Sequence, residues 1–240
     1  MGSPVPEEVG GYILAGGQSS RMGQNKALME LAGKPLIRHA VKKLRRVCMD
    51  VRVLGDNPKF SDYAPVVADI HPGCGPMSGM EAALIHSVFD WNLFLAVDMP
   101  FLPSKFLQHW LRFWLHEGQN LQWARVRMFT VDGYPQPGFC LLHKEVAPYL
   151  TSALEKGQYK LVPVLRAAGL ALAERHKKPP GSGFWCVPMS GFRATGVKKP
   201  SEAWMHTTEA QEAVQDLWFA NLNTPEEFAE AEKHVDALDT

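Results

Sequence analysis

The sequence lacks the features that mark secreted, membrane and nucleic-acid-binding proteins. Its four cysteines, among 240 residues, stand far apart without CxxC spacing, which argues against a disulfide scaffold and a structural zinc site. No apolar run reaches the roughly 20 residues that span a bilayer, and the N-terminus lacks the basic start and apolar stretch of a signal peptide. Lys and Arg together number 25, as do Asp and Glu, so there is no broad basic field for nucleic acid. We therefore expect a cytoplasmic protein that binds neither nucleic acid nor a membrane.

The composition provides material for a large core. Hydrophobic residues make up 46% of positions and charged residues 21%, which excludes a disordered or fibrous chain. No stretch rich in Gly, Ser or Pro divides the sequence, so we expect a single domain over residues 1–240 with a flexible N-terminus over residues 1–10. Residues 175–216 break the pattern, because prolines and glycines occur there among aromatic and basic side chains. We predict that this insertion is ordered and serves as a lid over the active site or as a self-association element.

Short apolar runs alternate along the chain with segments of helical periodicity. Five runs predict buried strands, at residues 11–15, 51–54, 65–68, 93–97 and 217–220. Helical periodicity covers residues 78–88, 104–115, 144–154 and 158–168. A last helix should begin at Pro225, where Thr224 and Glu227 have capping-box spacing, and run to the C-terminus. The alternation predicts an α/β fold, a three-layer sandwich with a mainly parallel sheet.

A further helix, expected to start at Pro35, has two distinct faces. Pro35 suits the first helical position, where its missing N–H has no partner to lose. The apolar face carries Leu36, Ile37, Ala40, Val41 and Leu44. The opposite, solvent-exposed face is predicted to carry Arg38, Lys42, Lys43 and Arg45. In the helix over residues 104–115, the side chains expected to point inward are Phe106, Leu107, Trp110, Leu111 and Trp114.

A glycine-rich segment, LAGGQSSRMGQNKAL over residues 14–28, follows the first predicted strand. Glycine lets a backbone approach a polyphosphate closely, and the amides freed by a turn form an anion-binding nest. Arg21 and Lys26 can add full positive charge. The segment matches neither GxxxxGKS/T nor GxGxxG, and by itself it can also be a tight strand-to-helix connection with solvated basic side chains.

Further motifs follow this segment in a characteristic order. The whole series is LAGG at residues 14–17, RMG at 21–23 with Lys26, GKPL at 33–36, GPMSGM at 75–80 preceded by Asp69, VDMPFLP at 97–103, YPQPGF at 134–139 and NLNTPEE at 221–227. On these motifs the chain resembles the molybdenum cofactor guanylyltransferase family, over roughly residues 10–170 and 217–230. The resemblance implies the nucleotide-diphospho-sugar transferase-like fold, which is Rossmann-like, and transfer of GMP from GTP to the terminal phosphate of molybdopterin.

The resemblance also implies a Mg²⁺-dependent reaction in which Lys26, Arg21 and Asp98 are the catalytic residues. Asp98 follows the predicted strand at 93–97, which puts its carboxylate at the carboxyl end of a parallel sheet, where α/β folds bind ligands. Mg²⁺ takes one or two protein carboxylates plus substrate phosphates, and Asp98 is the expected metal ligand. The alternatives are a helix N-cap for Asp98 and solvated surface charges for the two basic residues.

Nucleotide contacts are expected from two further groups of residues. The resemblance assigns them to Leu14, Ala15, Gly16 and Gly17, and to Asp69, Gly75 and Gly79. Guanylyl members of the family resemble LAGG here, whereas cytidylyl relatives tend to have LAAG, so Gly16 favours GTP over CTP through steric space. Backbone amides of the turn into the next helix could face the ligand, although that turn can also be purely structural.

Asn221 and Asn223 match paired asparagines that lie on the pterin side in the family. Because Asn also favours turns and helix starts, either can be structural instead. The sequence departs from the family at Asn25, where a carboxylate that could orient Lys26 is missing, and in the long insertion at 175–216. The product would go to molybdoenzymes or other cofactor-biosynthesis proteins, and the sequence leaves monomer and homo-oligomer open.

Two other functions stay open. One is a CTP:molybdopterin cytidylyltransferase or another nucleotidyltransferase of the same fold. The other is a catalytically weak binding module that holds a nucleotide or the finished cofactor and delivers it. Retention of Lys26 and Asp98 argues against the binding module.

Overall fold

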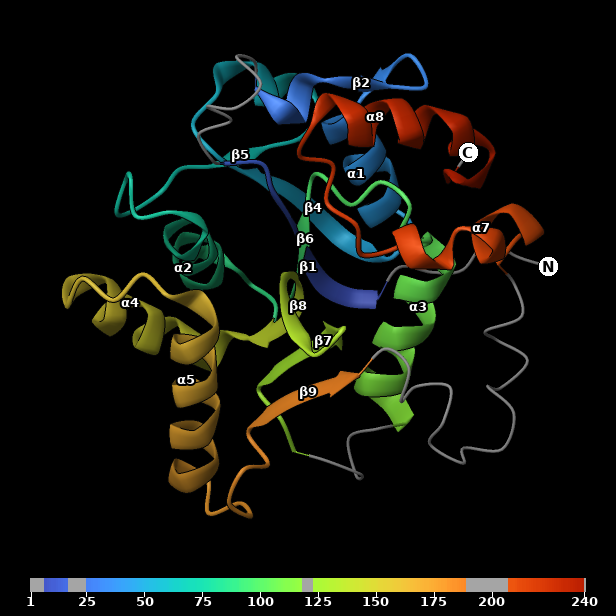
Figure 1. Cartoon of the computed structure of the whole chain (residues 1–240). Helices are drawn as coiled ribbons and strands as arrows, with labels where there is room; N and C mark the ends of the chain where they lie inside the picture. Colours follow the sequence, from blue (N-terminus) through green and yellow to red (C-terminus); the bar gives the residue numbers. More distant parts are fainter. Residues whose placement is uncertain (1–6, 17–24, 118–122, 189–206, 240) are drawn as a thin grey trace.

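In the part of the chain that the structure describes, seven strands form one sheet between two layers of helices (Figure 1). The structure is a computed structural model, and it describes residues 7–16, 25–117, 123–188 and 207–239. The strands of the sheet are β1 (Glu7–Leu14), β4 (Cys48–Leu54), β5 (Val66–Val67), β6 (Trp91–Ala96), β7 (Val126–Val131), β8 (Tyr134–His143) and β9 (Phe184–Pro188). Their order is β5-β4-β1-β6-β8-β7-β9, and β2 (Glu30–Leu31) pairs separately with β3 (Lys34–Pro35).

Most neighbouring strands of the sheet run parallel. β1 pairs in parallel with both β4 and β6, β4 with β5, and β7 with β9. β8 runs antiparallel to β6 and to β7. The predicted α/β fold with a mainly parallel sheet is therefore confirmed. Because β1, β4 and β6 are parallel neighbours, the loops that follow Leu14, Leu54 and Ala96 leave the sheet at the same edge.

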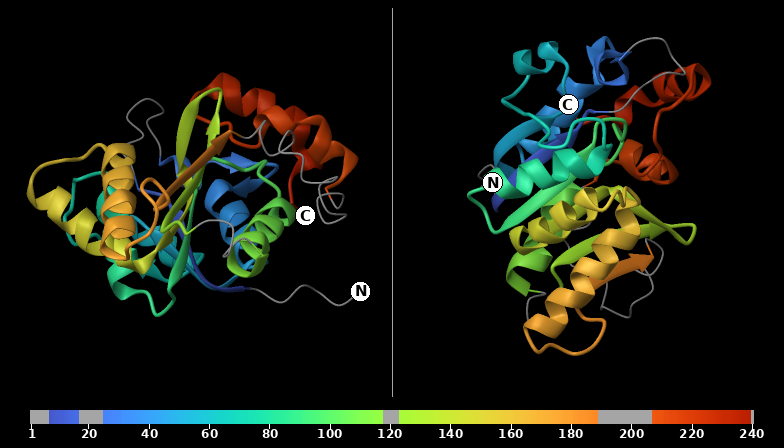
Figure 2. Two further views of the ribbon diagram at one scale, coloured as in Figure 1. Left: turned by 90° about the horizontal axis from the view of Figure 1, so that it is seen from below. Right: turned by 90° about the vertical axis from the view of Figure 1, so that its left-hand side faces the viewer.

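Helices cover both faces of the sheet (Figure 2). They are α1 (Leu36–Leu44), α2 (Pro76–His86), α3 (Ser104–Arg112), α4 (Ala147–Glu155), α5 (Leu161–Arg175), α7 (Glu209–Ala213) and α8 (Pro225–Ala231). One buried cluster packs α1, α3 and the C-terminal segment against one face of the sheet. A second packs α2, α4 and α5 against the other face. This is the predicted three-layer arrangement. Successive side chains of a strand point to opposite clusters: in β6, Leu93 and Leu95 belong to the first cluster and Phe94 to the second.

The helices predicted from periodicity are confirmed, with shifted ends. The predicted segments correspond to α1, α2, α3, α4 and α5, although α3 gives way to a π-helical turn at Phe113 and α5 runs on to Arg175. All five side chains expected to point inward from residues 104–115 are buried. α1 starts at Leu36, so Pro35 is its N-cap instead of its first residue.

The prediction for Lys43 of α1 is wrong. The pattern predicts it on the solvent face, but the residue is buried, with 1% of its surface exposed. The reason is tertiary: the loop after β6 covers this side of the helix, and Lys43 Nζ donates to backbone carbonyls of that loop.

The predicted strand at residues 217–220 is wrong. Gln215–Leu217 form a short 3-10 helix and the chain then turns. Trp218 and Phe219 are buried, but they pack against Phe106 of α3 instead of joining the sheet. A buried apolar run therefore does not by itself distinguish a strand from a turn that packs on a helix.

Both ends of the described chain also differ from expectation. β1 begins at Glu7, so residues 7–10 belong to the sheet and not to a flexible N-terminus. α8 begins with the predicted capping box at Thr224, but it ends at Ala231 and a 3-10 helix follows, so it does not continue to the C-terminus.

The expected insertion at 175–216 contributes to the sheet. Within it, β9 forms the edge of the sheet opposite β5. Residues 189–206 lie outside the described residues, and the lid or self-association role remains a prediction. The four cysteines are free thiols, and no helix in the described ranges is long and apolar enough to cross a membrane.

Candidate active site

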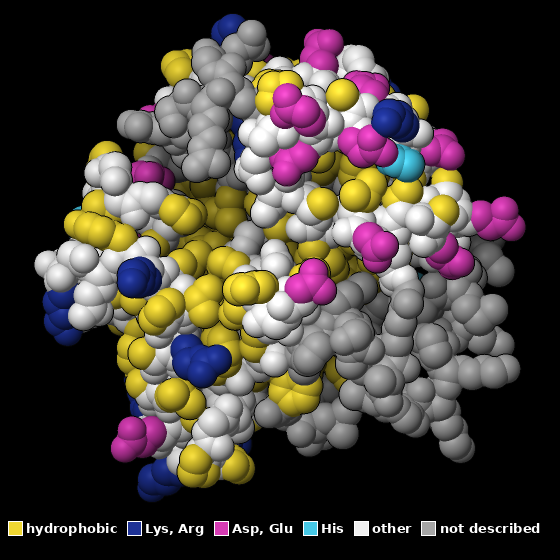
Figure 3. Space-filling view, viewed as in Figure 1, with side chains coloured by type: hydrophobic (Ala, Val, Ile, Leu, Met, Phe, Trp, Pro, Cys, Tyr) yellow, Lys and Arg dark blue, Asp and Glu magenta, His cyan; other side chains and the backbone are white. Residues whose placement is uncertain are grey.

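A pocket of about 420 Å³ opens where the loops after β1, β4 and β5 meet the start of α2. Its volume is in the range of small-molecule and cofactor sites. Five residues predicted to contact a nucleotide line it, namely Leu14, Gly16, Asp69, Gly75 and Gly79. Pro76 of the GPMSGM motif also lines it, as do four residues that were not predicted, Leu54, Gly55, Asp56 and Gly73. The space-filling view shows a hollow with an apolar floor on this face of the molecule (Figure 3).

At Gly75 the backbone conformation favours glycine, and at Gly79 neighbouring side chains crowd the position of a Cβ. Gly75 precedes α2 with a φ of 74°, in the region that favours glycine. A Cβ on Gly79 would lie 3.2 Å from Leu54 Cβ and 3.3 Å from Asp69 Oδ1. Glycine at these positions therefore has a structural reason, and both residues also border the pocket.

Gly16 has no such structural requirement. A Cβ there would meet Gly55 Cα at 3.6 Å and Leu54 O at 3.9 Å, which are ordinary contacts. Among the described residues, a methyl group at this position finds room and takes space from the pocket, in agreement with the steric interpretation of the LAGG motif. Ala15 differs from its neighbours, because it does not line the pocket: it is buried, and its N–H donates to Leu54 O at 3.0 Å.

The pocket carries two carboxylates, Asp56 and Asp69. Burial raises the pKa of Asp69 above its ordinary value, and the nearby Asp56 carboxylate raises it further. Two acidic side chains favour ligand groups with N–H donors and disfavour phosphates. A nucleotide bound here would therefore place its base, and not its polyphosphate, against this wall.

Beside the pocket, Lys26 is held by side chains from distant parts of the sequence. Its Nζ donates to Asp98 Oδ2 at 2.8 Å and to Asn223 Oδ1 at 2.5 Å. The Lys26 side chain is 18% exposed and that of Asp98 16%, so neither is a solvated surface charge. Val97 N donates to Leu14 O at 3.2 Å, which joins the loop carrying Asp98 to the wall of the pocket.

The sequence departs from the family at Asn25, and this residue fixes the backbone next to Lys26. Lys26 opens a short 3-10 helix, Lys26–Leu28, and Asn25 is its N-cap. Asn25 Oδ1 accepts a hydrogen bond from Ala27 N at 3.0 Å, and Ala27 is buried. An amide oxygen at position 25 therefore orients the backbone of Lys26, while Asp98 and Asn223 orient its ammonium.

Asp98 is not a helix cap, because α3 begins only at Ser104 with Pro103 as its N-cap. Its backbone carbonyl accepts a hydrogen bond from Leu222 N at 3.1 Å, which ties the C-terminal segment to this loop. Lys26 occupies Oδ2, and Oδ1 accepts no hydrogen bond from another described residue. Asp98 therefore has a carboxylate oxygen to offer a ligand.

The residues around Asp98 fit a magnesium ion that arrives with its nucleotide. Mg²⁺ needs one or two protein carboxylates when substrate phosphates complete its shell. No group of three or more His, Cys, Asp or Glu side chains in the described ranges could hold an ion by itself. A single carboxylate beside a lysine fits an ion that a nucleotide brings with it better than an ion that the protein holds by itself.

The two predicted asparagines differ in their contacts. Asn223 Nδ2 donates to Asn221 O at 3.1 Å, and the Asn223 N–H donates to the carboxylate of Glu227. These bonds aim Asn223 Oδ1 at Lys26, whereas Asn221 takes part through its backbone carbonyl. Gly17 and Arg21, also predicted for the site, lie outside the described residues.

Comparison with known proteins decides the family. The family model of the MobA-like NTP transferase domain matches residues 11–173. The chain belongs to this family. A molybdenum cofactor guanylyltransferase of Serratia proteamaculans is 34% identical over 170 residues, which cover 68% of this chain and 82% of that protein. The corresponding protein of Vibrio cholerae is 33% identical over 162 residues, 65% of this chain and 76% of its own.

A solved structure confirms the MobA-like fold over nearly the whole chain. The molybdopterin-guanine dinucleotide biosynthesis protein A of Archaeoglobus fulgidus superimposes with a TM-score of 0.67 and 23% identity, covering 95% of this chain and 99% of that one. The match to the MobA-like family model ends at residue 173, so β9 and the segment with Asn223 lie beyond it.

Sequence reasoning missed Gly55 and Asp56 in the pocket wall. A signal was present, because the two residues directly follow the strand predicted at 51–54, as Asp69 and Asp98 follow theirs. The same rule, that ligands bind at the carboxyl ends of parallel strands, would have selected them.

Proposed function

We propose that this protein transfers GMP from GTP to the terminal phosphate of molybdopterin and releases pyrophosphate. The observation that carries the proposal is the contact of Lys26 with Asp98 and Asn223 beside a pocket, in a MobA-like NTP transferase. The names of the curated relatives support the guanine nucleotide and this acceptor. The product would pass to a molybdoenzyme or another protein of cofactor biosynthesis.

The base of GTP is placed in the pocket between Gly16 and the two carboxylates. Guanine offers N–H donors that Asp56 and Asp69 can accept. Gly16 leaves space that a larger side chain would occupy, which suits the bulkier purine. Leu14, Gly75 and Gly79 would contact the nucleoside from the remaining walls.

The triphosphate is placed over Lys26. Its ammonium would turn from Asp98 towards the β and γ phosphates, together with Arg21, and neutralise their charge. When bound, Mg²⁺ would be held by Asp98 and phosphate oxygens and would withdraw negative charge from the phosphates. Asn223 would keep Lys26 within reach of the phosphates.

The chemical step needs little beyond alignment. The second pKa of a phosphomonoester is about 6, so the molybdopterin phosphate is already largely ionised near neutral pH. One of its oxygens attacks the α-phosphorus, the new P–O bond forms, and the bond to the bridging oxygen breaks as pyrophosphate leaves with the electron pair. No residue has to act as a general base, and the protein contributes orientation and charge neutralisation.

The test is a transfer assay with molybdopterin, Mg²⁺ and either GTP or CTP, read by the mass of the product and by pyrophosphate release. We expect a guanylyl product, with strongly reduced turnover for Asp98→Ala and normal turnover for Asp62→Ala, an exposed carboxylate in the 3-10 helix Pro58–Asp62. A cytidylyl product in excess would identify the rival transferase. Nucleotide binding without turnover would identify a binding module, and either result would contradict the proposal.

A further inference from the structure

A buried lysine lies beneath the loop that carries Asp98. Lys43 of α1 is 1% exposed and belongs to the largest fully buried side chains of the protein. Transfer of an ammonium group into a protein interior is unfavourable unless its donors find partners. The partners of Lys43 therefore indicate what the residue does.

The direct partners of Lys43 are two backbone carbonyls. Nζ donates to Pro100 O at 2.7 Å and to Met99 O at 3.3 Å, in the two residues that follow Asp98. Asp239 also stabilises the charge. Its carboxylate, however, accepts a hydrogen bond from Ser104 N at 2.8 Å and lies 3.7 Å from Arg46 Nη1. The ammonium is thus directed at the loop and not at a carboxylate.

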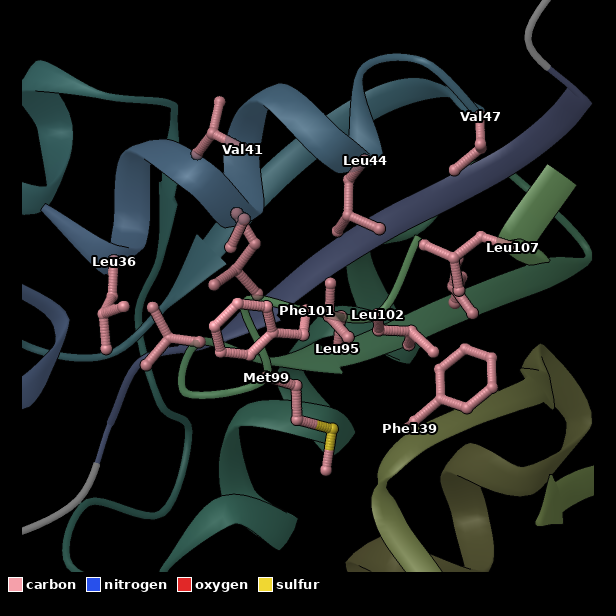
Figure 4. Close-up of a cluster of buried hydrophobic side chains, with 14 of the residues drawn as sticks. Leu36, Val41, Leu44, Val47, Leu95, Met99, Phe101, Leu102, Leu107 and Phe139 are labelled. Carbon is pink, nitrogen blue, oxygen red and sulfur yellow. The ribbon is translucent and has the colours of Figure 1, made fainter. Parts of the chain in front are cut away.

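The bonds from Lys43 add to two other backbone hydrogen bonds of this loop, from Met99 N to Ala96 O at 3.4 Å and from Leu222 N to Asp98 O at 3.1 Å. Met99, Phe101 and Leu102 insert their side chains into the core next to α1 (Figure 4). Pro100 and Pro103 have no N–H and cannot donate backbone hydrogen bonds. The two bonds from Lys43 are thus the side-chain bonds that fix the carbonyls of Met99 and Pro100, directly after Asp98.

We propose that Lys43 is a positioning residue: its ammonium fixes residues 98–100, so that the Asp98 carboxylate is aimed at the nucleotide-bound metal. The inference rests on the proposed function, which gives Asp98 its part in nucleotide binding. Burial lowers the pKa of Lys43 to about 8, so the group is charged at neutral pH and has three N–H donors. A misplacement of about 1 Å in such a site can reduce turnover on the order of 100-fold.

The test compares Lys43→Met with Lys42→Met. Methionine keeps an unbranched side chain in the core and removes the donor, and Lys42 is the exposed neighbour on the same helix. GTP is titrated calorimetrically into each folded protein, with Mg²⁺ and with EDTA. We expect Lys43→Met to bind GTP like the wild type in EDTA but to lose most of the affinity gained with Mg²⁺, and its kcat to fall roughly 10- to 100-fold at unchanged KM for molybdopterin. Lys42→Met should match the wild type in both measurements.

A second variant separates positioning from packing. Lys43→Gln keeps a neutral donor, so it should recover part of the Mg²⁺-linked affinity that Lys43→Met loses. Wild-type Mg²⁺ linkage and kcat in Lys43→Met would overturn the inference, as would failure of both variants to fold, because Lys43 would then serve stability alone. A wild-type protein that neither binds GTP nor transfers GMP would overturn the proposed function, and the inference with it.

Discussion

The ammonium of Lys26 and the carboxylate of Asp98 are paired at 2.8 Å, across two loops that leave the same edge of the sheet. Asn223 Oδ1, from the segment before α8, is the second acceptor of the same ammonium. The phosphate-binding and metal-binding groups of the proposed reaction are thereby held in place by each other. In the proposed reaction the ammonium turns from Asp98 to the phosphates when the nucleotide binds, so both charges are in place before the chemical step.

The first prediction concerns Lys26. Lys26→Met should lower kcat with GTP by roughly 10²- to 10³-fold, because it removes one of the positive charges that the proposed reaction places on the phosphates. Lys34→Met, an exposed lysine in β3, is the matched control and should leave kcat unchanged. Turnover of Lys26→Met close to the wild-type value in a steady-state pyrophosphate assay would remove Lys26 from the mechanism.

The second prediction concerns nucleotide choice. Gly16→Ala should leave the free energy of unfolding within about 0.5 kcal/mol of the wild type, since among the described residues its methyl group meets only ordinary contacts, to Gly55 and Leu54. It should weaken GTP binding by roughly 10- to 200-fold, the usual effect of one methyl group in a tight pocket, and change CTP binding much less. Gly55→Ala, at a φ of 145° and with a Cβ that would lie 2.8 Å from Phe60 Cε2, should instead destabilise the fold. Equal losses for GTP and CTP would contradict the steric interpretation of Gly16.

The third prediction concerns pH. Burial, with a further contribution from Arg125, lowers the pKa of His143 to about 4 although Glu145 acts in the opposite direction. Because this value lies below the ordinary 6.5, the folded protein binds fewer protons than the unfolded chain between pH 4 and 6.5. The lowered pKa of His143 therefore costs no stability above pH 6.5. As the pH falls from 6.5 to 4, the free energy of unfolding should decrease by roughly 3 kcal/mol.

Urea unfolding at a series of pH values measures this loss. His143→Gln cannot titrate, so its unfolding free energy should fall less over the same interval. Parallel curves for the two proteins would show that His143 does not cause the acid sensitivity.

The fourth prediction concerns a buried carboxylate behind the pocket. Glu81 of α2 is fully buried, and its Oε2 is 2.7 Å from His71 Nδ1, in the loop between Asp69 and Gly73. Oε1 has no partner among the described residues. His71→Ala leaves this carboxylate buried and unpaired, so it should destabilise the fold by about 3 kcal/mol. Adding Glu81→Leu should restore much of the loss, because an apolar side chain needs no partner.

Chemical denaturation of the wild type, both single variants and the double variant completes this cycle. A double variant that is as unstable as His71→Ala would contradict the account, since it would assign the loss to the loop and not to the carboxylate.

The parallel half of the sheet could be predicted because its strands are buried on both faces. β1, β4 and β6 therefore appear as short apolar runs, and the rule about carboxyl ends then places Asp69 and Asp98 at one edge. β8 escaped prediction because Pro135, Pro137 and Gly138 argue against a strand. The turn between β7 and β8 did have a sequence signal, the Asp-Gly pair at 132–133, which is typical of hairpins. In the structure both Asp132 and Gly133 have the positive φ that such a turn requires.

Long-range contacts set the limit of prediction at the site. The motif order identifies Lys26, Asp98 and Asn223 separately, but their meeting at one ammonium depends on how the C-terminal segment packs. Lys43 illustrates the same limit, because helical periodicity places it in solvent and only the folded loop after β6 provides its partners.

The central claim is that the pocket beside Asp98 binds a guanine nucleotide together with Mg²⁺. The most direct measurement is a calorimetric titration of GTP and, separately, of CTP into the purified protein with and without Mg²⁺, repeated on Asp98→Ala. The account predicts that GTP binds well, that CTP binds poorly, and that Asp98→Ala abolishes the effect of Mg²⁺. Tighter binding of CTP, or an effect of Mg²⁺ that survives in Asp98→Ala, would contradict it.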